Sequence, residues 1–422
     1  MIIPYFKLLL KRNFFLLCFS QIISQFGDKL TQLALVGLVS SLFKTSSNIH
    51  LAIVFSMTII PVVLFSPITG VYVDRWSKRK TMYFCDFLRA IMIFTIPLFF
   101  LKTHLFPFIC LMIFLSASAG RFFIPAKMAF FPQLIEKKEI FLANSLISVT
   151  ATSAAIFGFF FGGIIVDRLG LDAVFRLDAA TFLISALAII FITAREEDKF
   201  FTKNILKVGK EMVEAVKRSF IQELKEGIKY IHSSDETKYA FRTFLFLFSY
   251  VGALSTASIR YFQKILGDSS SNVREVGFIG VSLGVGIFIG SLIYGRIAHR
   301  FSIKKIINYS ILIASGFLIF FTVSIRVNPD SGYAIFLSFI LGLIISPIFI
   351  GINALIHKES QADLLGRIFG SLEFIGHLGL LIFMFVSSLL ADIMTPFTII
   401  VSVGIIGFLF SIFFIFSDDH SH

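Results

Sequence analysis

The chain has 422 residues, of which 56% are hydrophobic and 15% are charged, and its mean hydropathy is +0.88. A soluble domain carries roughly 25% charged residues, and a soluble fold of this length could not cover so much apolar surface with so few polar side chains. Composition therefore excludes a soluble enzyme, a secreted domain and a disordered chain, and it predicts an all-α membrane protein.

Apolar runs long enough to cross a bilayer follow one another along the chain, and only helices satisfy their own backbone hydrogen bonds there without closing a barrel. The first run is too long for the apolar core of a cleavable signal peptide, so we expect it to be a true span. Twelve spans are predicted, near residues 13–41, 48–73, 81–101, 105–127, 141–166, 172–194, 241–264, 274–298, 305–325, 332–356, 366–390 and 394–416.

The longest polar stretch divides these spans into two sets of six. We therefore predict a six-helix bundle in residues 1–194, a cytoplasmic linker in 195–240 and a second bundle in 241–422. Apolar residues from Ile205 to Ile228 recur at helical spacing with lysines between them, which predicts an amphipathic helix on the inner leaflet. A regulatory or partner-binding role is the alternative to a basic membrane-surface linker.

The net charge of +12 comes from basic residues in the short connectors. The membrane explains this pattern better than nucleic acid does, because Lys and Arg collect in cytoplasmic loops. With a cytoplasmic N-terminus, about 26 of them lie inside and about eight outside. We expect an inner-membrane protein, monomeric, with both termini in the cytoplasm and no nucleic-acid partner.

Two connectors resemble each other at an offset of 225 residues, about half the chain. They are GVYVDRWSKRK at 70–80 and GRIAHRFSIKK at 295–305. Pro125 and Pro347 mark a second pair at a similar offset, so we infer a duplicated six-span unit. The aligned residues are Gly70 with Gly295, Asp74 with His299, Arg75 with Arg300, and Arg79 and Lys80 with Lys304 and Lys305.

The segment 70–80 resembles the signature loop of the major facilitator superfamily, Gly-x-x-x-Asp-Arg-x-x-x-Arg-Lys. The twelve spans, two halves and long middle loop extend the resemblance over the whole chain, which implies two six-helix bundles of the major facilitator fold. It also implies that Gly70 lets two helices approach closely. Asp74 is then expected to cap a helix and pair with Arg, an interaction that stabilises one state of the gate by about 1–2 kcal/mol. His299 in place of Asp predicts a weaker or pH-sensitive second gate.

Further segments are similar to bacterial macrolide-efflux-like members and to lysophospholipid transporters. They are SQFGDKLTQLAL at 24–35, CDFLRA at 85–90 and residues 124–146. In the fifth span, Gly158, Gly162 and Gly163 match the antiporter signature of the superfamily, while Ala154 and Phe159 stand where it has Gly and Pro. Small residues predict close helix packing here. The glycine-rich run at 280–290 is likewise predicted to pack helices.

Ionisable side chains inside spans are functional candidates, because a charge at the bilayer centre costs roughly 2.5–3.5 kcal/mol. Asp28 lies near the middle of the first span, and Gln21, Gln25 and Gln32 share its polar stripe. We expect the stripe to face a central cavity, the glutamines to contact the substrate and Asp28 to exchange the coupling proton. A structural partnership with Lys29 or with a neighbouring helix is the alternative.

Two further charged pairs lie in the spans. Glu373 and His377 are four residues apart, share a helix face and are also proton-coupling candidates, with a packing pair as the alternative. Asp86 and Arg89, near the inner end of the third span, are expected to pair with each other or with the signature loop.

These features predict a secondary active transporter that exports hydrophobic or amphipathic small molecules by alternating access, as a proton antiporter. The alternative is a lysophospholipid flippase of the inner membrane. The sequence contains no Walker loop, zinc-protease motif or nucleophile elbow, and Cys18, Cys85 and Cys110 lie inside apolar runs without metal spacing. We therefore expect no enzyme activity, no cofactor and no bound metal.

Overall fold

The computed structural model describes residues 7–43, 47–74, 76–103, 105–193, 225, 235–266, 273–297, 302–359 and 365–419. These residues form helices and no strand, which confirms the predicted all-α fold. The chain divides into two compact units. We call Met1–Leu38 with Ile53–Gln222 the first unit, and Val39–Ala52 with Glu223–His422 the second unit. The predicted linker helix at 205–228 lies outside the described residues except for Lys225.

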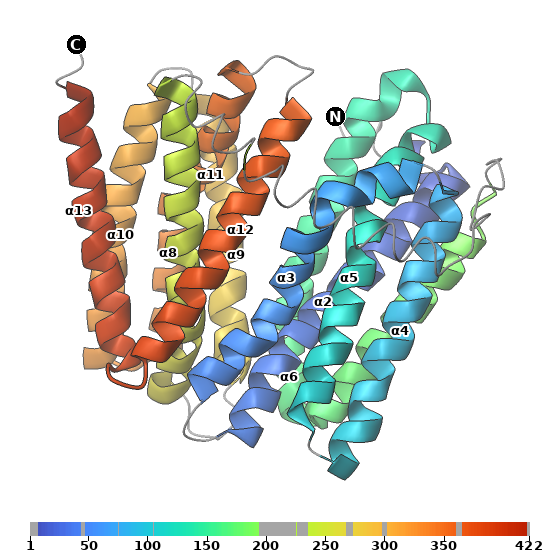
Figure 1. Ribbon diagram of the computed structural model, residues 1–422, viewed down its shortest axis with the longest axis horizontal. Helices are drawn as coiled ribbons and strands as arrows, with labels where there is room; N and C mark the ends of the chain where they lie inside the picture. The colour runs from blue at the N-terminus through green and yellow to red at the C-terminus, as the bar shows by residue number, and fades with distance from the viewer. Residues whose placement is uncertain are drawn as a thin grey trace. The chain divides into compact units, whose positions relative to one another are not determined.

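In the first unit, α4 packs against both α5 and α6 (Figure 1). Helix α6 runs through two predicted spans, 141–166 and 172–194, which are separated at Gly170, where φ is +80°. Glycine adopts that conformation without a steric penalty. The elements are α2 (Arg12–Leu42), α3 (Ser47–Asp74), α4 (Lys78–Thr103), α5 (Phe106–Phe130), the 3₁₀ turns Phe131–Leu134 and Lys137–Glu139, and α6 (Ile140–Ile190).

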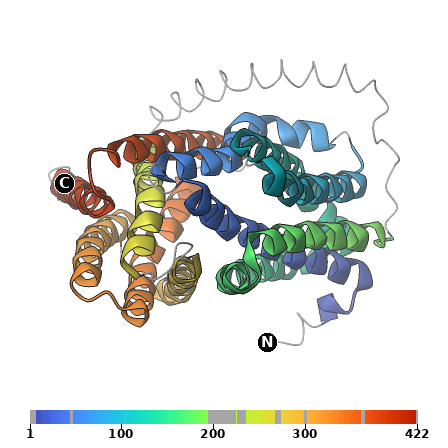
Figure 2. The same cartoon turned by 90° about the horizontal axis from the view of Figure 1, so that it is seen from below.

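In the second unit, α11 packs on α9, α12 packs on α8, and α10 contacts both α11 and α13. Figure 2 shows α10 and α13 side by side, as this packing requires. The helices are α8 (Asp235–Leu266), α9 (Val273–Ile297), α10 (Ile303–Val327), α11 (Ser331–Glu359), α12 (Leu365–Leu390) and α13 (Pro396–Asp419).

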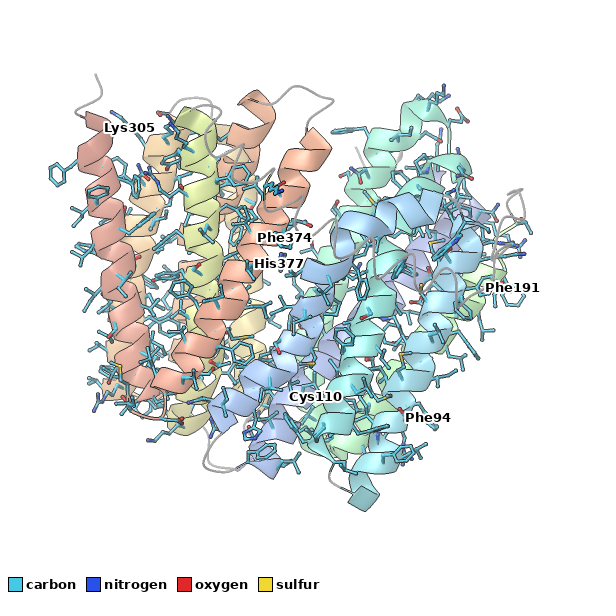
Figure 3. The ribbon with its side chains drawn as sticks, viewed as in Figure 1. Phe94, Cys110, Phe191, Lys305, Phe374 and His377 are labelled. Carbon is cyan, nitrogen blue, oxygen red and sulfur yellow. The ribbon has the colours of Figure 1, made fainter. Side chains whose placement is uncertain are left out.

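Length and composition make ten helical segments of the described residues able to span a membrane, with α6 counted once. Helix α2 is not among them, because Asp28, Lys29 and its glutamines lower its hydropathy. Large apolar side chains lie on the outside of the bundles: Phe94 of α4 is 46% exposed and Phe191, just after α6, is 60% exposed (Figure 3). Exposed aromatic rings of this size fit a surface that faces lipid.

Glycines allow α6 to lie directly against α2. A Cβ atom at Gly158 would lie 2.8 Å from the backbone oxygen of Phe26, and one at Gly162 would lie 3.0 Å from Leu33 Cδ1. Gly163 is buried beside them. Any larger residue at Gly158 would push the two helices apart, so the glycine-rich part of the fifth predicted span sets their separation.

We expect Gly158→Ala to lower the free energy of unfolding by about 1–3 kcal/mol, the usual effect of overpacking. Gly284→Ala in α9 is the matched control, because a Cβ there would meet nothing within 4 Å and alanine has the higher helix propensity. Thermal unfolding of the two purified variants in detergent measures the difference. Equal midpoints would show that Gly158 does not set the contact between α2 and α6.

Candidate functional site

A polar cavity of about 280 Å³ lies in the first unit, between α2, α4, α5 and α6. Helix α2 contributes Gln25, Asp28, Lys29 and Gln32 to its lining. Their spacing of three and four residues places them on one face of the helix. The other charged groups of the lining are Arg89 of α4, Arg121 and Lys127 of α5, and Asp178 of α6.

Arg89 forms the central contact of this cavity. Its guanidinium pairs with the carboxylate of Asp28 on α2 and lies 3.8 Å from Asp86, one helical turn earlier on α4. It also lies 3.9 Å from the centre of the Phe182 ring on α6, as a cation–π contact. The Asp28 side chain is 37% exposed, whereas Asp86 is fully buried. Of the two carboxylates beside Arg89, Asp28 is therefore the one that faces the cavity.

Hydroxyl groups hold the two buried carboxylates. Ser185 of α6 donates a hydrogen bond to Asp86 (2.5 Å), and Thr31 of α2 donates one to Asp178 (2.5 Å). Thr181 donates a second hydrogen bond to Asp178 (3.2 Å). A buried carboxylate needs such donors to offset its lost hydration. These bonds tie α2, α4 and α6 into one polar network.

Of the three glutamines in the predicted polar stripe of α2, Gln25 and Gln32 line this cavity and Gln21 does not; their contact with a substrate stays a prediction. Gln21 is 1% exposed, does not line the cavity, and donates from Nε2 to the backbone oxygen of Ile147 (3.0 Å). It lies two helical turns before Asp28, where α6 covers α2. Its amide therefore bonds to the backbone of a neighbouring helix and is closed off from the cavity.

The expected contact between Asp86 and Arg89 is present, with Nη1 of Arg89 3.8 Å from Oδ1 of Asp86. Helix α4 begins at Lys78, so Arg89 lies about 16 Å along its axis from that end. Arg89 also pairs with Asp28, a contact that was not specifically predicted. Asp178 was missed altogether, although a lone carboxylate in an apolar run was the feature that identified Asp28.

The contact between Glu373 and His377 on α12 runs through the backbone. Nδ1 of His377 donates to the backbone oxygen of Glu373 (2.7 Å), and the imidazole edge lies against Phe248, with ring centroids 5.1 Å apart. The carboxylate of Glu373 is exposed. Figure 3 shows His377 and Phe374 one turn apart on this helix.

Part of the signature loop can be located. Arg79 donates a hydrogen bond to the backbone oxygen of Ile192, at the end of α6, where a cation stabilises the helix terminus. The backbone NH of Lys80 donates to the Ser77 hydroxyl (3.3 Å). Outside the described residues lie Arg75, His299 and Arg300, and also the side chain of Asp74 and the surroundings of Gly70 and Gly295.

A second cavity, of about 360 Å³, lies in the second unit and is almost wholly apolar. Helices α8, α9, α10 and α11 form its walls, with Ile400 of α13. Phe246, Tyr250, Leu283 and Phe321 are among its lining residues, and within the described part of the chain no Asp, Glu, Lys, Arg or His lines it. No feature of the sequence considered above indicates this cavity.

Comparison with known proteins gives a single family. The sequence profile of the Major Facilitator Superfamily matches residues 17–383 and 240–422. An uncharacterised transporter of this type, YkuC of Bacillus subtilis (strain 168), is 26% identical over 368 residues, which cover 85% of this chain and 81% of YkuC. Macrolide efflux protein A of Streptococcus pyogenes is 23% identical over 400 residues, which cover 90% of each chain.

A solved structure supports the same fold. The crystal structure of the nucleoside transporter NupG superposes with a TM-score of 0.66 at 16% identity, over 95% of this chain and 98% of that chain. At this identity the likeness concerns the fold alone. Together with the profile match, it confirms the predicted class of twelve transmembrane helices in two six-helix bundles.

We expect Arg89→Met to destabilise the protein by about 3–5 kcal/mol, because it leaves Asp86 and Asp28 without their cation. Arg176→Met is the control: its pair with Asp172 is half-exposed, so its loss should cost about 1 kcal/mol or less. The free energy of unfolding of both variants in detergent is the measurement. Combining Arg89→Met with Asp28→Asn should recover part of the loss. Similar losses in the two arginine variants would contradict a central role for Arg89.

Proposed function

We propose that this chain exports hydrophobic or amphipathic small molecules in exchange for protons. The chain belongs to the Major Facilitator Superfamily of membrane transporters and is not an enzyme. The observation that carries this proposal is the pair formed by Asp28 and Arg89 at the wall of the polar cavity. The similarity to Macrolide efflux protein A, an efflux protein by its name, supports the direction of transport and the substrate class.

Asp28 has the properties that a proton carrier needs. Its carboxylate reaches the cavity, so protons can enter and leave, and its partner is a buried guanidinium. A proton that binds to Asp28 removes the negative charge of the pair. Arg89 then loses the electrostatic attraction that holds α4 to α2. The protonation state of Asp28 therefore changes the strength of the contact between these two helices.

Arg89 has a second partner within reach. Asp86 Oδ1 lies 3.8 Å from Nη1 of Arg89, and this oxygen forms no hydrogen bond within the described residues. We therefore expect the guanidinium to move toward Asp86 when Asp28 is protonated. A side chain with two carboxylate partners can bias a conformational equilibrium, and about 1.4 kcal/mol shifts it tenfold.

The proposal extends to location. The excess of Lys and Arg in the connectors expected to face the cytoplasm supports an inner-membrane protein with both termini inside. Its partners are then the bilayer, the exported molecule and protons. Glu373 and His377 are kept as further proton-coupling candidates, with a smaller part than Asp28 because their contact runs through the backbone.

Uptake of a radiolabelled macrolide into proteoliposomes with an acidic lumen tests the exchange. We expect Asp28→Asn to abolish the component of uptake that the pH gradient drives, because asparagine cannot bind or release the coupling proton. Passive exchange of the macrolide across the membrane should persist, since the cavity itself remains.

Asp172→Asn is the matched control, because Asp172 forms an ion pair with Arg176 one turn along the same helix and does not line the cavity. It should transport at the wild-type rate. Gradient-driven uptake by Asp28→Asn at that rate would refute the role of Asp28. Uptake by the wild type that ignores the gradient would refute proton exchange, and uptake of lysophospholipid in place of the macrolide would favour a flippase.

A further inference from the structure

We propose that the apolar cavity of the second unit binds the uncharged apolar part of the exported molecule, together with one hydrogen-bond acceptor such as an ester oxygen. The inference rests on the proposed export function, because it assigns the cavity to the molecule that is exported. It names a binding site inside one six-helix unit.

The size and lining of the cavity indicate an apolar ligand. A folded interior has few voids larger than a water molecule, whereas this cavity measures about 360 Å³. Its walls carry aliphatic and aromatic side chains and a few hydroxyl groups. An apolar cavity does not hold water well and readily takes up small apolar molecules. A charged ligand would lose its hydration there without finding a counter-ion.

The glycine-rich run of α9 changes its role along the helix. A Cβ at Gly290 would lie 2.9 Å from the backbone oxygen of Leu343, and one at Gly286 would lie 3.0 Å from the Cα of Gly342, so these glycines hold α9 against α11. Gly280 lines the cavity, and a Cβ there would meet nothing within 4 Å. Gly280 therefore serves no close packing contact and leaves space at the cavity wall.

The internal repeat explains where the space comes from. At the offset of 225 residues that relates the two connectors, Asp86 and Arg89 of α4 correspond to Ile311 and Ala314 of α10. Both Ile311 and Ala314 line the apolar cavity. The place that holds the charged pair in the first unit thus carries an aliphatic side chain and a methyl group in the second, and the volume of an arginine side chain is absent.

One polar group of the wall is suited to an acceptor on the ligand. Tyr250 lines the cavity beside Ser315, and its buried hydroxyl lies near the Ser315 hydroxyl without forming a hydrogen bond of good geometry within the described residues. Buried hydroxyl groups nearly always have a partner, and an unmet donor costs about 1–3 kcal/mol. An ester or lactone oxygen on an otherwise apolar molecule would accept this hydrogen bond.

Binding of two small probes to the full-length protein in nanodiscs tests the site. Methyl benzoate carries an ester acceptor, and n-propylbenzene has a similar size without one. We expect Gly280→Leu, which fills the cavity, to weaken binding of both probes about tenfold or more and to leave the unfolding midpoint unchanged or raised. Tyr250→Phe should lower the affinity for methyl benzoate to that for n-propylbenzene.

Gly284→Leu is the matched control, because Gly284 is on the same helix, has open space around it and does not line the cavity. It should bind both probes as the wild type does. Wild-type affinity of Gly280→Leu for the probes would overturn the proposal, and so would equal effects of the two leucine variants. If Gly280→Leu unfolds, Ala314→Leu fills the same cavity from α10 and replaces it in the test.

Transport links the site to the exported molecule. We expect Gly280→Leu to raise the KM for macrolide uptake about tenfold and to leave kcat at the wild-type value. An unchanged KM with lost probe binding would overturn the assignment to the exported molecule and point to a lipid chain instead. If the wild type fails to transport macrolide, the proposed function fails, whereas the probe measurements, made without a gradient, still decide whether the cavity binds apolar esters.

Discussion

The packing of the first unit is organised around a buried arginine. Arg89 is 9% exposed, and a guanidinium in such a place is stable only if carboxylates surround it with good geometry. Asp28 and Asp86 meet this need from α2 and α4. Asp178 and the hydroxyl groups of Thr31 and Ser185 extend the network to α6. The helices therefore pack at the separations that keep this charge satisfied.

Small residues make that network possible. A Cβ at Gly27 would overlap the carboxylate of Asp178 and the hydroxyl of Thr181, so the carboxylate rests directly on the backbone of α2. Gly158 brings α6 equally close to α2 further along. The polar contacts therefore depend on the close approach of the helices. A hydrogen bond as short as that between Thr31 and Asp178 forms only where the two helix backbones lie very close together.

The sequence predicted the features that one helix displays by itself. Hydropathy located the spans, and the cost of a membrane charge identified Asp28, whose polar face lines the cavity. Contacts between helices were not predictable in this way, because a helical pattern states which residues share a face and not which helix covers it. For this reason Gln21 was wrongly expected in the cavity, and the pair of Arg89 with Asp28 was not expected. Asp178 could have been found by the argument used for Asp28.

Under the proposed function, the two halves of the internal repeat carry two kinds of chemistry that conflict in one place. Charges that exchange protons need donors, counter-ions and access to water, whereas an apolar ligand is bound most strongly where these are absent. In the first unit α4 carries Asp86 and Arg89, and in the second unit the corresponding positions of α10 are Ile311 and Ala314. The proposed function and the proposed ligand assign coupling to the half that carries these charges and apolar recognition to the half in which the corresponding positions are apolar. An arginine at position 314 would then bring a buried charge without carboxylate partners into the second unit, which explains why that position carries a small apolar side chain.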